Sequence, residues 1–205
     1  MKQRRKGLYS ENRDSRAQPF NDTRLFSGKP CPEGVPPVSA QAFRIRQAGP
    51  ADREILASLI CGSHRDVAER FGLTPENCPR HPSNCTVEWI DQDLSRGTVY
   101  SILDCRDAPA GCAAIEYASP EACYLERLSV LPAYRRRGFG EALVRDVIRR
   151  AKDLGAQEVG IGIIARHEAL KLWYAGIGFI EGETKEFPHL PFSVTFMRYM
   201  CRTRP

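Results

Sequence analysis

Along this chain, the spacing of hydrophobic residues changes several times between the period of a strand and that of a helix. Apolar residues at alternate positions, or in short apolar runs, predict strands over residues 43–48, 98–103, 111–117, 124–131 and 158–164, with the last strands at Phe179 and 194–199. Apolar residues three or four positions apart predict helices over residues 52–71, 86–94, 140–154 and 167–175. This order indicates an α/β fold, a mixed central sheet of about six to seven strands flanked by helices.

The first forty residues show neither period. Eight lysines and arginines face four acidic residues there, so this segment carries a net charge of +4 out of +5 for the whole chain. Because it is also polar and rich in proline, we predict a flexible extension over residues 1–40 and one domain over residues 41–205. A solvated tail is favoured over one that binds RNA or acidic lipids. The remainder is nearly neutral, so we expect no nucleic-acid partner.

Two missing signals and the cysteine pattern indicate the cellular setting. No run of about 18 apolar residues could span a membrane, and the basic start is not followed by the apolar core of a secretory signal. The eight cysteines are scattered, and several fall in or near predicted strands, where a free thiol behaves as a small hydrophobic group. We therefore expect a cytoplasmic protein with reduced thiols. We expect it to be a monomer or a homodimer.

The most informative segment is Arg135-Arg136-Arg137-Gly138-Phe139-Gly140, between a predicted strand and a predicted helix. Glycines at such a junction let backbone N–H groups point outward, and the helix N-terminus and the arginines add positive charge, which suits a pyrophosphate. No Walker pattern occurs in the chain. A dinucleotide-binding loop is disfavoured because Leu143 stands at its third glycine position and Pro132 intervenes after the strand. A basic turn without a ligand is the structural alternative.

The same segment fits the Arg/Gln-x-x-Gly-x-Gly/Ala loop of the GNAT acetyltransferases without a gap. Downstream, Leu172-Trp173-Tyr174-Ala175-Gly176-Ile177-Gly178-Phe179 resembles the second hallmark of that family, a helix that carries a tyrosine and ends in Gly-Phe. His167 and Leu170 depart from the Asn and Ala of the family pattern. The resemblance covers residues 42–200 and is strongest over residues 124–180. It implies the GNAT fold, with acetyl-CoA as the co-substrate.

The resemblance also implies which residues hold the cofactor. The backbone N–H groups of residues 136–140 would bind the pyrophosphate, and Arg136 or Arg137 would add charge, while Arg135 begins the family motif. The main chain of the preceding strand would pair with the pantetheine arm, and one of its amides would stabilise the oxyanion. His167 would lie near the cofactor or cap its helix. The cofactor-binding candidates are Leu128, Val130, Arg135, Arg136, Arg137, Gly138, Phe139, Gly140 and His167.

Two residues are candidates for the catalytic proton transfers. Tyr174 matches the family's usual proton donor to the departing thiolate, although an aromatic side chain that fills a helix–sheet contact is the structural alternative. Glu126 is the candidate base, and period-2 spacing predicts that it shares a face of its strand with Leu128 and Val130. An exposed Glu126 paired with a cation is an equally good interpretation. Glu116, on the preceding strand, is the next candidate.

A second cluster, Cys78-Pro79-Arg80-His81-Pro82-Ser83-Asn84-Cys85, contains three residue types that zinc can use. Cys78, His81 and Cys85 are weak metal candidates because no fourth ligand lies nearby. We favour a metal-free loop that shapes the acceptor pocket, and so expect no metal cofactor. The resemblance places the acceptor site near this region, and His81 and His189 would line the pocket.

These observations predict an acetyl-CoA-dependent N-acetyltransferase in which a primary amine attacks the thioester directly. The acceptor is left open between a small molecule and a protein N-terminus or lysine. The alternatives are a GNAT-fold module that binds acyl-CoA without turnover and a zinc-stabilised interaction protein.

Overall fold

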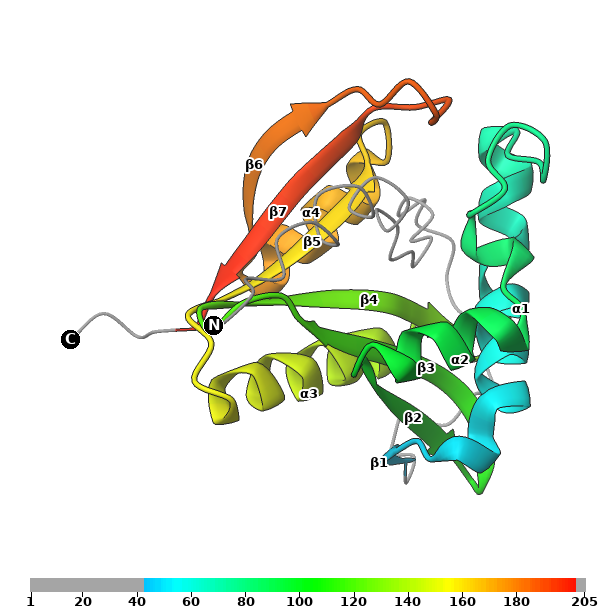
Figure 1. Cartoon of the computed structure of the whole chain (residues 1–205), viewed down its shortest axis with the longest axis vertical. Helices are drawn as coiled ribbons and strands as arrows, with labels where there is room; N and C mark the ends of the chain where they lie inside the picture. The colour runs from blue at the N-terminus through cyan, green and yellow to red at the C-terminus, as the bar shows by residue number, and fades with distance from the viewer. Residues whose placement is uncertain (1–42, 202–205) are drawn as a thin grey trace, which may run out of the picture.

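The computed structural model describes residues 43–201, so the extension predicted over residues 1–40 lies outside the described residues. Seven strands form one sheet with the order β1-β2-β3-β4-β5-β7-β6. Within this sheet, β4 and β5 run parallel and the other neighbouring strands run antiparallel (Figure 1). The strands are β1 Phe43–Gln47, β2 Val99–Cys105, β3 Ala108–Tyr117, β4 Ala122–Val130, β5 Glu158–Ile164, β6 Ile180–Lys185 and β7 Val194–Met200.

The helices of the described residues flank this sheet, and the predicted α/β class with a mixed sheet is confirmed. They are α1 Arg53–Phe71, α2 Val87–Ser95, α3 Phe139–Asp153 and α4 Glu168–Ile177. Helices α1 and α2 lie on one face of β2–β4 and α3 lies on the other, while α4 lies behind β5 and β7 (Figure 1). No helix of the described residues is long and apolar enough to cross a membrane.

The alternation of apolar side chains in β2 and β3 divides the core into two parts. Tyr100, Ile102 and Ala114 pack with α1 and α2. Leu103 and Ile115, at intervening positions, belong to the larger cluster around α3 and α4. Because successive strand residues point to opposite faces, both faces of the central strands are buried. A polar residue at such a position therefore sits in an apolar setting.

Strand β4 contains a bulge at Arg127. Ala114 of β3 pairs with Glu126, whereas Cys112 pairs with Ser129, so two residues of β4 lie opposite one residue of β3. The φ angle of Arg127 is 53°, a left-handed value that is rare outside glycine. An extra residue of this kind interrupts the alternation of side chains, so the residues after it point to the opposite faces from those that strict alternation would give them.

The bulge overturns one prediction about the site. Glu126 lies opposite Ala114 and so projects to the face covered by α1 and α2. Leu128 and Val130, beyond the bulge, are buried in the cluster around α3. The prediction that these three residues share one face is wrong, because strict period-2 spacing holds only for an uninterrupted strand.

Strands β4 and β5 pair over a short stretch, with Ala122–Tyr124 opposite Glu158–Gly160. Beyond these residues the two strands diverge (Figure 1). The second half of β5 continues to pair with β7, and β7 pairs with β6, so these three strands diverge from β4 as one unit. The facing backbone edges of β4 and β5 are therefore not paired with each other past Tyr124, directly before the loop that leads into α3.

Candidate active site

The loop between β4 and α3 presents the N-terminus of a helix. A short 3-10 turn, Pro132–Tyr134, follows the strand, and α3 then begins at Phe139. Arg136 and Gly138 have left-handed φ angles of 61° and 79°. The first bond into the helix runs from the N–H of Ala142 to the carbonyl of Gly138 (2.9 Å). The preceding N–H groups have no partner inside the helix, and such a terminus binds anions.

Arg135 anchors this loop to α1. Its Nε donates to the carbonyl of Val130 (3.1 Å), and its Nη2 donates to the carbonyl of Ser63 (2.7 Å) and to Asp66 Oδ1 (3.1 Å). Burial alone would raise the pKa of Asp66, but the hydrogen bond and charge of Arg135 outweigh it and lower that pKa. The guanidinium of Arg135 therefore holds the loop against α1 and the end of β4.

The other side chains of the loop divide between solvent and core. Arg136 and Arg137 are exposed, and the guanidinium of Arg137 lies 5.4 Å from the ring centre of Tyr134. Phe139 is 2% exposed, and its ring contacts Tyr134 (6.4 Å between centroids) and Phe43 (5.4 Å). The predicted cofactor role of Phe139 can therefore belong only to its backbone N–H, because its side chain is part of the core.

Tyr174 is completely buried in α4. Its ring lies edge-on to Trp173 (4.8 Å) and Phe179 (5.2 Å). Its hydroxyl has no hydrogen-bond partner among residues 43–201. Burial raises the pKa of Tyr174 well above its usual value, so the phenol stays protonated at neutral pH. A buried hydroxyl without a hydrogen-bond partner lowers the stability of the folded state by about 1–3 kcal/mol. This hydroxyl is therefore suited to donate a hydrogen bond to a bound group.

His167 caps α4. Its Nδ1 accepts a hydrogen bond from the N–H of Leu170 (3.2 Å), and its ring lies 5.6 Å from that of Phe71. With Nδ1 as the acceptor, the proton of the neutral ring lies on Nε2. The capping role that was the alternative for His167 is thus confirmed, and only Nε2 could also reach a ligand.

The structure brings together two carboxylates that the sequence suggested separately. Glu126 lies opposite Ala114 and Glu116 lies opposite Tyr124, so the two acids are diagonal neighbours on the face that α1 and α2 cover. Diagonal neighbours have Cβ atoms about 7–8 Å apart or less. Glu116 is 3% exposed and Glu126 is 6% exposed, so both carboxylates lie in a mostly dehydrated setting.

A charged network that the sequence did not suggest lies beside Glu126. The side chain of Arg127 is almost fully buried and pairs with Asp93 of α2. Oδ2 of Asp93 lies 3.4 Å from Nε of Arg127 and accepts a hydrogen bond from the hydroxyl of Tyr100 (2.7 Å). Arg127 also lies 5.7 Å from the ring centre of Trp89. Asp93 falls within a predicted helix, where spacing alone does not separate a buried acid from a solvated one.

The two histidines predicted to line the acceptor pocket have different surroundings. His81 is 1% exposed, lies 6.1 Å from the ring of His64 and places Nδ1 2.8 Å from the hydroxyl of Ser83. Burial, with a smaller effect of nearby Arg127, lowers the pKa of His81 to about 4, so this ring is neutral. His189 is exposed in the connection from β6 to β7 and contacts Phe187 (6.0 Å).

The candidate zinc site is not formed. Over residues 43–201, no three His, Cys, Asp or Glu side chains gather closely enough to hold a metal ion. Cys78 and Cys85 are buried free thiols, and burial raises the pKa of Cys85 to about 11.

Comparisons with known proteins agree with this arrangement. The acetyltransferase (GNAT) family matches residues 66–179. The uncharacterized N-acetyltransferase YvbK of Bacillus subtilis (strain 168) is 33% identical over 73 residues, which span 36% of this chain and 46% of that protein.

Two solved structures share the fold. The PaiA N-acetyltransferase from Thermoplasma acidophilum, in complex with coenzyme A, superimposes with a TM-score of 0.66 at 16% identity, over 78% of this chain and 99% of the other. The ribosomal-protein-S18-alanine N-acetyltransferase from Escherichia coli gives a TM-score of 0.64 at 15% identity, over 80% and 97% of the two chains. Because the family match spans more than half of this chain, the chain belongs to the GNAT acetyltransferase family.

Proposed function

We propose that this protein is an acetyl-CoA-dependent N-acetyltransferase whose acceptor is a primary amine that attacks the thioester directly. The observation that carries this proposal is the buried Tyr174 hydroxyl, which has no hydrogen-bond partner among the described residues and stays protonated. Membership of the GNAT family and the divergence of β4 from β5 support it. We also propose that the protein acts in the cytoplasm, which the free thiols at all seven described cysteines favour.

The chain offers suitable groups for each part of coenzyme A. The N–H groups of Gly138, Phe139 and Gly140 at the start of α3 suit the pyrophosphate, and the exposed Arg136 and Arg137 add charge. The main chain of β4 around Leu128 and Val130 faces the divergence from β5 and suits the amides of the pantetheine arm. A backbone N–H at the same place would stabilise the oxyanion that forms during attack.

The acceptor amine must lose a proton before it attacks. A lysine-like amine with a pKa of about 10.4 is neutral in roughly one molecule in 2,500 at pH 7, which corresponds to about 4.6 kcal/mol. Glu126 is our candidate base, directly or through water, and Glu116 is the second candidate. Both lie on the face opposite α3, so the amine would approach from the α1–α2 side of the sheet.

The departing thiolate needs only partial help, because a thiol has a pKa of about 8.5. We assign that help to Tyr174. Its phenol is a hydrogen-bond donor that burial keeps protonated, and α4 and its aromatic neighbours hold the ring in one orientation. No covalent enzyme intermediate is required. Cys123, the thiol on β4, is buried, and burial raises its pKa to about 11, which makes it a poor nucleophile.

The test is the release of free thiol from acetyl-CoA in the presence of a panel of primary amines, with coenzyme A binding measured in parallel by calorimetry. We expect amine-dependent thiol release. Tight binding of coenzyme A without thiol release for any amine would instead identify a binding module of the same fold.

A further inference from the structure

The bulge in β4 places two oppositely charged side chains on the same face of the sheet. Glu126 lies opposite Ala114, which belongs to the cluster that packs with α1 and α2. The side chain of Arg127 reaches Asp93 and the ring of Trp89, both on α2. In an uninterrupted strand, consecutive side chains point to opposite faces. The bulge therefore gives the candidate base a buried cation as its neighbour on the same face.

Two more charged side chains join this pair. Oδ2 of Asp93 lies 3.4 Å from Nε of Arg127 and accepts a hydrogen bond from the hydroxyl of Tyr100, and Oδ1 of Asp93 forms an ion pair with Arg96. We call Asp93, Arg96, Glu126 and Arg127 the charge cluster. It contains two cations and two carboxylates, so its formal charges cancel. The side chain of Arg96 is 32% exposed, whereas the other three are almost fully buried and poorly screened by water.

Glu126 and Arg127 act on each other. Burial alone would lower the pKa of Arg127, but the ionisable groups around it, Tyr100, Asp93 and Glu126 among them, outweigh burial and raise that pKa. Because an interaction between two charges acts on both, Arg127 also favours the ionised form of Glu126. A carboxylate held ionised in this way is a weak base. The negative charge of Asp93 offsets the effect of Arg127.

The other ionisable groups around Arg127 keep one charge state near neutral pH. Burial lowers the pKa of His64, on α1, to about 3 and that of His81 to about 4, with smaller effects from nearby charges. Burial raises the pKa of Cys85 to about 11 and also raises the pKa values of Cys112 and Tyr100. Between about pH 5 and pH 9 these five groups therefore stay neutral.

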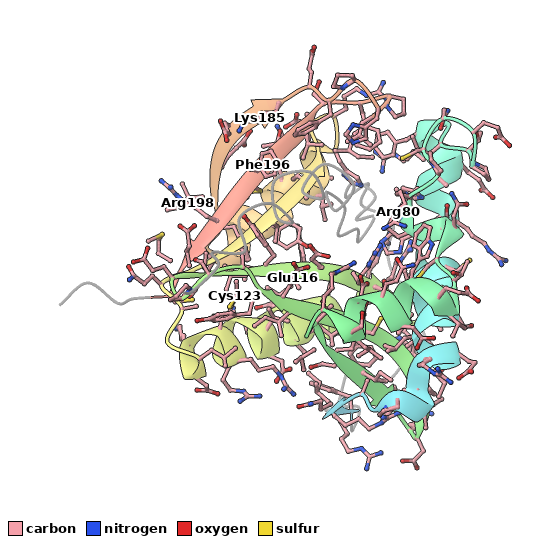
Figure 2. The ribbon with its side chains drawn as sticks, viewed as in Figure 1. Arg80, Glu116, Cys123, Lys185, Phe196 and Arg198 are labelled. Atoms are coloured by element: carbon pink, nitrogen blue, oxygen red, sulfur yellow. The ribbon has the colours of Figure 1, made fainter. Side chains whose placement is uncertain are left out.

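Two further charged residues lie on this side of the sheet. The guanidinium of Arg80 is 4.9 Å from the ring centre of Trp89, and Glu116 is the diagonal neighbour of Glu126. Figure 2 shows Arg80 on the side where α1 and α2 lie and Glu116 at the central strands. Arg80 is exposed, so water screens its charge, whereas Glu116 is buried and needs its own control.

We propose that Asp93 is a positioning residue for the candidate base: its negative charge offsets that of Arg127 and so sets the pH at which the Glu126 carboxylate takes up a proton. This inference rests on the proposed N-acetyltransferase function and adds a residue of α2 to that same site. Asp93 acts on the reaction through Arg127, without contact with the substrate.

The experiment measures how kcat/KM for thiol release from acetyl-CoA depends on pH, with one primary amine as the acceptor throughout. Protonation of a general base makes kcat/KM fall at low pH, and the midpoint of this fall is the observed quantity. Arg127→Gln should raise the midpoint by about one pH unit, because Glu126 loses its buried cation while Asp93 stays. Asp93→Asn should lower the midpoint by about one pH unit, because Arg127 is then less compensated.

Three further variants support this comparison. Arg96→Gln changes only a partly exposed cation, so it keeps the fold even if Asp93→Asn does not, and it should raise the midpoint by about 0.3 pH units. Asp91→Asn removes an exposed carboxylate from the same helix and should leave the midpoint unchanged. In a Glu116→Gln background, the shift caused by Arg127→Gln should persist, since Glu126 is the titrating group.

A role of Asp93 in folding alone would lower activity without moving the midpoint. Unchanged midpoints in Arg127→Gln and Arg96→Gln, or a shift that disappears in the Glu116→Gln background, would overturn the inference and leave the proposed acetyl transfer intact. If no amine gives thiol release, the Glu126 carboxyl carbon is titrated by NMR, with its signal assigned by its loss in Glu126→Gln. The same shifts there would support the coupling although the proposed function has failed, and unshifted titrations would overturn it.

Discussion

The carboxylate of Asp93, on α2, lies 3.4 Å from Nε of Arg127, the residue whose left-handed backbone makes the bulge in β4. Both side chains are almost fully buried, at 4% and 9% exposure. Helix α2, on one face of the sheet, thus holds Arg127, the bulge residue of β4. The bulge places Glu126 on the face covered by α1 and α2 and Leu128 on the face covered by α3, so the Asp93–Arg127 pair holds the point at which the side chains of β4 change face.

Replacing Asp93 by Asn should destabilise the protein strongly. The buried guanidinium of Arg127 would lose its ion pair with Asp93, and Arg96 would lose its ion pair with the same carboxylate, which together cost about 3 kcal/mol of unfolding free energy. Urea denaturation followed by circular dichroism measures this. Asp91→Asn is the control, since its exposed pair with Arg53 should contribute no more than about 1 kcal/mol. Equal losses in the two variants would contradict the role assigned to the buried pair.

Tyr174→Phe should separate catalysis from cofactor binding. It removes one hydroxyl from a ring that aromatic packing holds in place, so we expect kcat to fall about 10²-fold with little change in the Kd of coenzyme A. Tyr199→Phe, which removes a hydroxyl from a ring near Phe179, is the control and should leave kcat within about twofold of wild type. Undiminished kcat in Tyr174→Phe would rule out the proton-donor role.

Gly138→Ala should weaken coenzyme A binding. Gly138 has a φ of 79°, and an alanine in the left-handed region costs about 1 kcal/mol or more, which the loop can relieve by turning its N–H groups away. We expect a rise of about fivefold or more in the Kd of coenzyme A, measured by calorimetry. Gly176→Ala, at a helical position with open space around it, is the matched control and should leave the Kd unchanged. A similar Kd of coenzyme A in both variants would show that this loop does not bind the cofactor.

Stability should fall as the pH drops below about 6.5. Burial lowers the pKa of His64 to about 3 and that of His81 to about 4, with smaller effects from nearby arginines. Both rings are therefore neutral in the folded state, while the unfolded chain takes up their protons below pH 6.5. Their stabilising contribution is complete above pH 6.5 and is lost toward pH 4 by about 1.4 kcal/mol per pH unit for each histidine.

This pH dependence can be assigned with two variants. His64→Asn should reduce the slope of unfolding free energy between pH 6.5 and 5 by about half of the part due to the two histidines, since one of the two buried rings is gone. His189→Asn, at an exposed position, should leave the slope unchanged. The measurement is urea denaturation across this pH range. A slope that His64→Asn does not change would show that the buried ring is not the source.

Hydrophobic periodicity was sufficient to predict most of the elements. The strand Glu158–Ile164 coincides with its prediction, and α1 continues through Gly62 as its apolar spacing required. Each of these elements has an apolar face that packs on a neighbour, and such a face leaves a clear period in the sequence. The loop from Arg135 to Gly140 could also be recognised in the sequence. Glycine just before a helix permits a left-handed backbone conformation that other residues rarely adopt, so its position there is a local signal.

The features that the sequence did not predict depend on contacts between distant residues or on an unusual backbone conformation. The bulge at Arg127 has no sequence signature, because the residue that adopts the left-handed conformation is not a glycine. The contact that anchors Arg135 could not be read from the sequence, because its partner, Asp66, lies 69 residues away in the chain. The burial of the Phe139 side chain could not be read either, because its ring contacts Phe43 of β1, far away in the chain.

The short pairing of β4 with β5 has a mechanical consequence. It is the seam at which the half of the sheet built from β1–β4 meets the half built from β5–β7, and three residues from each strand join the two halves there. A ligand that binds across this seam would bind the folded state alone, so it would stabilise the fold by about RT ln(1 + [L]/Kd). The melting temperature should then rise with the concentration of the cofactor, and the abundance of the protein would depend on the concentration of its acetyl donor.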